Sequence, residues 1–193
     1  MLTIRNLSSS LLPEIDFLEL LPGQCIAIYG ESGSGKTLLL RAIADLDTNT
    51  ANIELNNQNR DSLPANQWRE NIIYLPAESH WWSDQVKQHF THDIDAEALG
   101  LSNEIINWDI SRLSTGEKQR LALLRALDRK PGILLMDETT ANLDHENTLR
   151  VEKLIANKCA EGLAVIWVTH DKEQRQRIAD RSYRIDSNGL EED

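Results

Sequence analysis

The sequence predicts an α/β fold built around a largely parallel sheet. Short apolar segments of strand length alternate with longer stretches of helical periodicity, as in sheets whose strands are joined by helices. Two segments, residues 133–136 and 164–169, are apolar throughout, which is typical of strands covered on both faces. A third apolar segment leads directly into a glycine-rich turn at residues 30–35. These observations together favour a parallel α/β core.

The first half of the chain supplies strands and one buried helix. Residues 24–29 predict a buried strand, and residues 37–46 predict a helix that is apolar over most of its circumference. Short strands are expected at residues 52–55 and 72–75. This order of strand, turn, helix and strand is what a sheet covered by helices requires.

The second half adds a crossover helix and a change of pattern. Residues 144–158 carry apolar side chains at i, i+3 and i+4, which predicts an amphipathic helix. Residues 79–112 contain short helical pieces without strands and suggest a small inserted helical lobe. We expect a single domain, residues 1–193, in which the acidic end at 190–193 is a solvated tail.

Composition narrows the partners and the compartment. The chain has 20 Lys and Arg against 31 Asp and Glu, and its net charge of −11 repels phosphate backbones, so no nucleic acid is expected. Cys25 and Cys159 lack the spacing of a disulfide framework or a thiolate zinc site. Glu14, Asp16 and Glu19 interrupt any export signal, and no apolar run reaches the roughly 18 residues that cross a bilayer. The sequence predicts a cytoplasmic protein.

The glycine-rich turn matches the phosphate-binding pattern G-x-x-x-x-G-K-[ST]. Its residues are Gly30, Glu31, Ser32, Gly33, Ser34, Gly35, Lys36 and Thr37. Glycines let backbone N–H groups surround phosphate oxygens at a helix N-terminus, where the helix dipole favours an anion. Lys36 is expected to reach the β- and γ-phosphates, and the Thr37 hydroxyl to bind Mg²⁺. An incidental glycine turn is the alternative, but the strand before it and the helix after it favour a nucleotide site.

An acidic pair completes the chemistry of such a site. Asp137 and Glu138 follow the apolar segment 133–136. Asp137 is expected to approach Mg²⁺, and Glu138 to accept a proton from the attacking water. An apolar strand that ends in two acids is common by itself, so its meaning depends on the phosphate-binding turn in the same chain.

Three further motifs resemble those of ATP-binding cassette (ABC) ATPases. The segment LSTGEKQR at residues 113–120, which contains Ser114 and Gly116, resembles the family's signature loop. Ala-Asn-Leu-Asp, which ends at Asp144, resembles the D-loop, and His170 resembles the switch histidine. Together with the phosphate-binding turn and the acidic pair, these motifs follow the family's order over nearly the whole chain.

The resemblance implies a fold, a reaction and partners. The fold would be a P-loop NTPase, with a RecA-like core and the helical lobe, that hydrolyses ATP with Mg²⁺. Two chains would enclose two ATP molecules, so that Ser114 and Gly116 contact the γ-phosphate of the partner's nucleotide. His170 would contact the γ-phosphate of its own site, and Asp144 would belong to the nucleotide-binding set. The dimer would power a separate transmembrane permease at the inner face of the cell membrane.

The chain departs from the family's pattern at two functional positions. In the family, the Q-loop glutamine contacts Mg²⁺ and relays changes to the membrane partner. Ala77 stands at that position in this chain, and Glu78 is the candidate substitute. The aromatic residue that stacks on adenine is missing, because Ser8 to Leu12 offers only serine and leucine. Broad acceptance of nucleotide bases is therefore expected.

Some features leave alternatives open. His89 and His92 form an H-x-x-H pair that suggests a metal, although a structural role for both is favoured. Trp81 and Trp82 fit either core packing in the lobe or an exposed anchor for another protein. Two other functions remain as alternatives to transport: a soluble ABC ATPase, and a nucleotide-dependent regulatory module.

Overall fold

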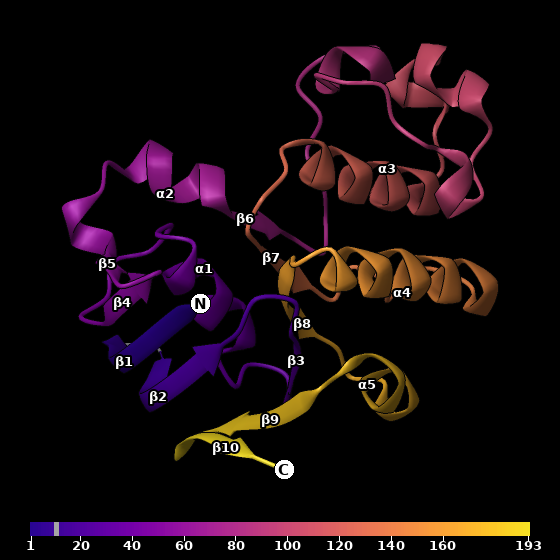
Figure 1. Cartoon of the computed structure of the whole chain (residues 1–193). Coiled ribbons are helices and arrows are strands. Elements are labelled where there is room, and N and C mark those ends of the chain that lie inside the picture. The colour runs from indigo at the N-terminus through magenta and orange to yellow at the C-terminus, as the bar shows by residue number, and fades with distance from the viewer. Residues whose placement is uncertain (10–11) are drawn as a thin grey trace.

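A mixed sheet runs through the centre of the molecule in the computed structural model, which describes residues 1–9 and 12–193 (Figure 1). In these residues it has six strands in the order β10-β9-β3-β8-β7-β6. The strands are β3 (Cys25–Tyr29), β6 (Ile72–Leu75), β7 (Ile133–Asp137), β8 (Ala164–Val168), β9 (Arg181–Asp186) and β10 (Gly189–Glu192). β10 is antiparallel to β9, and the other neighbours are parallel. The predicted α/β fold with a mostly parallel sheet is confirmed.

Helices connect these strands. They are α1 (Lys36–Ile43), α2 (Ala65–Asn71), α3 (Thr115–Asp128), α4 (His145–Ala160) and α5 (Lys172–Ile178). α1 and α4 lie where the sequence predicts helices, but α1 stops early because Asp45 adopts a left-handed conformation with a φ of 57°. Within the described residues, no helix is both long and apolar enough to cross a membrane.

The central sheet is covered on both faces, which explains its continuously apolar strands. Alternate side chains point to opposite sides of a strand. Leu135 and Ile166 pack on one face with α1 and the N-terminal strands, and Leu134 and Trp167 pack on the other with α3 and α4. The charged and polar groups of the site are therefore confined to the strand ends.

A second, antiparallel sheet has the order β2-β1-β4-β5 and covers one side of the core (Figure 1). Its strands are β1 (Leu2–Ser9), β2 (Leu12–Leu20), β4 (Asn52–Leu55) and β5 (Gln58–Asn59). The sequence analysis predicted β4 but neither β1 nor β2. In β2 the buried side chains of Ile15, Leu18 and Leu20 alternate imperfectly with the exposed acids Glu14 and Asp16, which weakens the period-2 signal.

The segment between β6 and α3 forms a lobe that lies at the upper right in Figure 1. Its helical pieces are 3₁₀ turns rather than α-helices: η2 (Val86–His89), η3 (Glu97–Leu99), η4 (Asn103–Asn107) and η5 (Ile110–Arg112). A further 3₁₀ turn, η1 (Arg60–Ser62), lies outside this lobe, between β5 and α2. Val86, Leu99 and Ile105 are buried against α3 and α4. Burial of these apolar side chains attaches the lobe to the core. Its turns are too short to give a clear helical periodicity in the sequence.

The acidic residues 191–193 are exposed, as the sequence analysis expected, but the chain end is not a free tail, and that part of the expectation is wrong. β10 pairs with β9, and both guanidinium nitrogens Nε and Nη2 of Arg181 donate to the Glu192 carboxylate at 2.6 Å. The Tyr29 hydroxyl donates to Asp193 at 2.6 Å. The partners of these acids come from β3 and β9, so the sequence of the chain end alone does not reveal them.

We expect Trp68→Ala to lower the free energy of unfolding by about 3 to 5 kcal/mol, because the indole is fully buried and its removal leaves a cavity. Trp68 Nε1 also donates to the Ile43 carbonyl at the end of α1, 2.9 Å away. Urea unfolding followed by circular dichroism measures the change. Phe17→Ala is the control because Phe17 is half exposed, and a similar loss in both variants would contradict this account of the core.

Candidate functional site

The predicted site residues follow the carboxyl ends of β3, β7 and β8. The strand register places Ile28, Val168 and Asp137 in one row across the sheet, so these three strands end at the same edge. In parallel α/β sheets this edge is where ligands bind. Residues that lie a hundred positions apart in sequence are brought together there.

The glycine-rich loop joins β3 to α1. It contains the predicted residues Gly30, Glu31, Ser32, Gly33, Ser34 and Gly35. Lys36 is buried, and its Nζ donates to the carbonyls of Gly30 and Glu31 at 3.1 and 2.9 Å, so the ammonium group lies within the loop. Gly35 has a φ of +102°, which a residue with a side chain rarely adopts. A Cβ at Gly30 would lie 2.3 Å from the Ile185 carbonyl.

The donors of this loop fit a phosphate. Ser34 Oγ is buried without a hydrogen-bond partner among the described residues, which is costly unless a further group supplies one. Glu31, Ser32 and Gly33 are exposed at the rim. The first turn of α1 contains no acidic residue, so nothing there opposes the helix dipole's attraction for an anion.

Thr37 and Asp137 form an oxygen-rich corner beside the loop. The Thr37 hydroxyl donates to Asp137 Oδ2 at 2.8 Å. The Tyr74 hydroxyl donates to the same oxygen at 2.9 Å, and burial together with the Asp137 charge raises the pKa of Tyr74. A hydroxyl and a carboxylate are the kind of ligands that Mg²⁺ uses at nucleotide sites, so these residues fit that ion. The sequence analysis missed Tyr74.

Glu138 and His170 form a pair next to this corner. His170 Nε2 lies 2.7 Å from Glu138 Oε1, and both side chains are accessible. Glu138 has a φ of 50°, and its N–H donates to the Val168 carbonyl, so the chain turns sharply at the strand end. This turn places the Glu138 carboxylate beside the His170 imidazole. In such a pair the carboxylate can act as a general base while the imidazole orients it.

Ser114 and Gly116 lie at the start of α3. Ser114 is the N-cap residue, and it forms a capping box with Glu117. Gly116 packs against the loop of residues 141–144, because a Cβ there would lie 3.3 Å from Leu143 Cδ2. The structure therefore brings Ser114 and Gly116 beside the predicted D-loop.

Asp144, the last residue of that loop, is the N-cap of α4, and its two carboxylate oxygens accept from the backbone N–H and the side-chain amide of Asn147. These bonds lower its pKa. Asn147 in turn accepts from Arg120 of α3 at 2.7 Å, and the Arg120 guanidinium also donates to Gly116 and to Leu99 in the lobe. This network was not predicted, because its members have no characteristic spacing.

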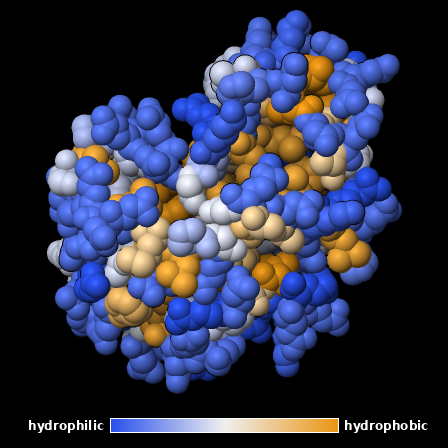
Figure 2. All heavy atoms as spheres, in the orientation of Figure 1, coloured by the Kyte–Doolittle hydropathy of each residue, from blue (hydrophilic) through white to orange (hydrophobic). Residues whose placement is uncertain are grey.

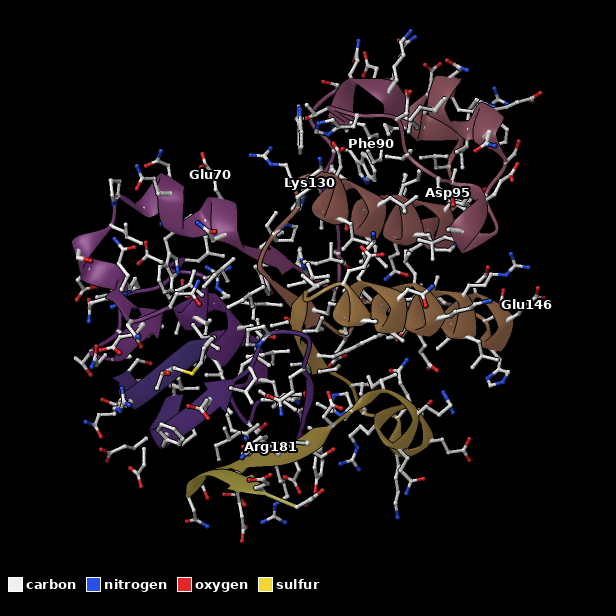
Figure 3. The ribbon with its side chains drawn as sticks, viewed as in Figure 1. Glu70, Phe90, Asp95, Lys130, Glu146 and Arg181 are labelled. Carbon is white, nitrogen blue, oxygen red and sulfur yellow. The ribbon has the colours of Figure 1, made fainter. Side chains whose placement is uncertain are left out.

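The view with side chains shows how these two helices are aligned. In Figure 3, Glu146 marks the N-terminal end of α4, and Lys130 lies just beyond the opposite, C-terminal end of α3. The N-terminal ends of α3 and α4 thus lie on the same side of the molecule, as the Arg120–Asn147 contact requires.

Two further expectations concern the base and the histidines. Leu12 and Pro13 lie next to Gly35; the other residues considered for stacking on the base include 10 and 11, which lie outside the described residues. His89 Nε2 is 3.0 Å from the Ser83 carbonyl, and His92 Nδ1 is 2.8 Å from Asp128. Among residues 1–9 and 12–193, no three or more His, Cys, Asp or Glu side chains are grouped so that they could hold a metal ion. The hydrogen bonds of His89 and His92 support structural roles for both histidines.

Comparison with known proteins decides the family. A family model described as "ABC transporter" matches residues 16–141. This chain belongs to the ABC transporter family. The "Aliphatic sulfonates import ATP-binding protein SsuB" of Granulibacter bethesdensis is 38% identical to it over 85% of the chain and 69% of the relative. The SsuB of Albidiferax ferrireducens is 36% identical over 86% of the chain, which spans 62% of that relative.

Solved structures of ABC proteins share the fold. A dimeric, post-hydrolysis state of the ATP-binding cassette MJ0796, bound to ADP and Pi, superposes with a TM-score of 0.82 at 21% identity over all of this chain and 98% of the other. An Atm1-family ABC exporter with ATP bound also superposes with a TM-score of 0.82, at 20% identity over 98% of this chain and 38% of the other. The predicted P-loop NTPase fold of the ABC family is confirmed.

We expect Glu138→Gln to keep ATP binding and to lose nearly all hydrolysis, because an amide keeps the shape of the side chain but cannot take a proton from water. The variant should also shift from monomer to dimer when ATP is added, because a closed pair that cannot hydrolyse cannot reopen. Phosphate release and gel filtration with Mg-ATP measure the two effects. Turnover at the wild-type rate would show that Glu138 is not the catalytic base.

GTP should bind within about tenfold of ATP, a difference of roughly 1.4 kcal/mol. The physical reason is that Leu12 and Pro13 offer an aliphatic surface beside Gly35, whereas selective stacking on a base uses an aromatic ring. Competition of both nucleotides against a fluorescent analogue measures the ratio. A hundredfold preference for ATP would mean that another residue reads the base.

Proposed function

We propose that this chain binds and hydrolyses ATP to power a separate membrane permease, and that it works as a homodimer with two composite ATP sites. The observation that carries the proposal is the geometry at one sheet edge. The Thr37–Asp137 corner and the Glu138–His170 pair lie next to each other there, beside the phosphate-binding loop. This arrangement supplies the groups that hydrolysis of a nucleoside triphosphate requires.

Each group at this edge has a chemical task under the proposal. Lys36 and the backbone N–H groups of residues 30–35 bind the phosphates, while Thr37 and Asp137 hold Mg²⁺. When bound, Mg²⁺ neutralises phosphate charge. The reaction is ATP plus water to ADP plus phosphate. Glu138 takes a proton from the attacking water. His170 contacts the γ-phosphate of its own site, and its imidazole also keeps the Glu138 carboxylate in place.

The dimer follows from the position of the signature residues. Ser114 and Gly116 lie beside the loop of residues 141–144, on the side of the molecule where α3 and α4 begin. We expect this surface to close on the γ-phosphate bound by a second copy, with Asp144 at the contact. The Arg120–Asn147 network joins the start of α3, with Ser114 and Gly116, to the start of α4, with Asp144. Closure of the dimer would therefore move these two segments together.

The permease would dock in a cavity of about 290 Å³ between the lobe and the rest of the molecule. Figure 2 shows hydrophobic residues gathered on this face where the lobe covers α3. Besides apolar side chains, the wall contains Arg69, Arg125 and Arg129, although the chain as a whole has a charge of −11. Charge complementarity therefore favours a permease segment that carries acidic side chains. With this partner bound, the chain would lie at the inner face of the membrane.

Trp81 and Trp82 differ in their surroundings. Trp82 lines the cavity and is 69% exposed. Trp81 is partly buried, and its ring packs on the core of the lobe. The Arg125 guanidinium lies near both rings, 4.4 Å from the centre of Trp81 and 4.8 Å from that of Trp82, so burial and not this contact distinguishes them. These positions support a docking role for Trp82 and a packing role for Trp81. The solute name carried by the SsuB relatives makes an anion such as an aliphatic sulfonate the first solute to test.

Trp82→Ala should keep the melting temperature and the basal ATPase rate, but it should reduce recovery with the membrane partner at least tenfold, because exposed aromatic side chains dominate interface energies. The measurement is the amount of membrane protein that co-purifies with the tagged chain from a detergent-solubilised membrane fraction. Phe17→Ala serves as the control, since it removes an exposed aromatic ring elsewhere on the surface. Trp81→Ala should instead lower the melting temperature.

Three outcomes would contradict parts of this proposal. If Trp82→Ala still co-purifies at the wild-type level, the docking surface is wrong. If the wild type associates with no membrane protein but hydrolyses ATP, a soluble ABC ATPase is the better description, and if it only binds ATP, a regulatory module is.

A further inference from the structure

One carboxylate oxygen in the Thr37–Asp137 corner, here called the metal corner because we propose that it holds Mg²⁺, accepts hydrogen bonds from two hydroxyl groups. Asp137 Oδ2 receives the Thr37 hydroxyl at 2.8 Å and the Tyr74 hydroxyl at 2.9 Å. Thr37 belongs to α1, whereas Tyr74 belongs to β6, the strand beside β7. The carboxylate is thus held from two independent elements, which fixes its rotation more firmly than either bond alone.

The Tyr74 hydroxyl is the donor in its contact with Asp137, because a carboxylate oxygen can only accept a hydrogen bond. The backbone register explains the reach of this side chain: Tyr74 pairs with Leu135, two residues before Asp137. Its position on the edge strand lets the hydroxyl approach the end of β7 from the side.

Tyr74 also lines the cavity between the lobe and the core. It therefore touches both the metal corner and the surface on which we propose that the permease docks. Three residues later the chain has Ala77, whose side chain has no polar group, and the Ala77 carbonyl accepts from Gln119 at 3.1 Å. Among the residues of β6, Tyr74 provides the polar contact with the metal corner.

We propose that Tyr74 is a positioning residue, whose hydroxyl orients the Asp137 carboxylate for Mg²⁺ and so sets the metal affinity of the nucleotide complex. The inference rests on the proposed function, because it needs the magnesium site described there. Groups that hydrogen-bond a metal ligand, without touching the metal, typically change metal affinity by 10- to 100-fold when removed.

Tyr74→Phe removes the hydroxyl and leaves the ring in the cavity wall. We expect the Mg²⁺ concentration that half-saturates binding of a fluorescent ATP analogue to rise about tenfold. Binding of the analogue in EDTA and the melting temperature should stay as in the wild type, because the ring still packs. At saturating Mg²⁺, hydrolysis should return to within about twofold of the wild-type rate.

Tyr183→Phe is the matched control. It removes a phenol hydroxyl that lies 3.4 Å from the Glu192 carboxylate, away from the metal corner, and should leave the Mg²⁺ midpoint unchanged. A Mg²⁺ midpoint for Tyr74→Phe within twofold of wild type would overturn the inference, as would a tenfold loss of hydrolysis at saturating Mg²⁺. If wild-type binding showed no dependence on Mg²⁺, the magnesium site itself and this inference would fall together.

Discussion

The parallel pairing of β8 with β3 on one side and with β7 on the other is the constraint on which the site depends. This register fixes Ile28, Val168 and Asp137 at one level, so the loop after β3 and the acids after β7 emerge side by side. Burial of the sheet on both faces makes the register expensive to change, because a slip of one residue would exchange the two core faces. The site is therefore positioned by hydrophobic packing, although its own groups are polar.

Polar groups then refine what packing has positioned. Asp137 is held by hydroxyls from α1 and β6, and Glu138 by the imidazole that follows β8. Each of these contacts joins two elements that are far apart in sequence and that the sheet brings together. An acid at a strand end is in this way converted into a carboxylate with a defined direction, which metal binding and proton transfer both require.

The lobe and the N-terminal end of α4 are connected differently. Arg120 is largely buried, and its guanidinium joins the signature helix to the lobe and, through Asn147, to α4. Burial lowers its pKa, but several acceptors compensate for the lost hydration. A buried cation that donates to three acceptors on different elements favours movement of the whole unit over bending within it. The strong negative charge of the chain lies mainly outside these contacts and outside the cavity where the arginines gather.

The sequence by itself determined the sheet core, α1, α4 and the residues of the phosphate-binding loop and acidic pair, because apolar periodicity and short motifs are local signals. It did not determine β1 and β2, whose alternation is imperfect, nor the pairing of the acidic end in β10, whose basic partner Arg181 is identified only once the strands are neighbours. Tyr74 and the Arg120–Asn147 contact were likewise decided by the tertiary structure. Tyr74 and Asp137 are 63 positions apart, and Arg120 and Asn147 are 27 positions apart. A local sequence pattern describes one segment, so it does not reveal a hydrogen bond between two distant segments.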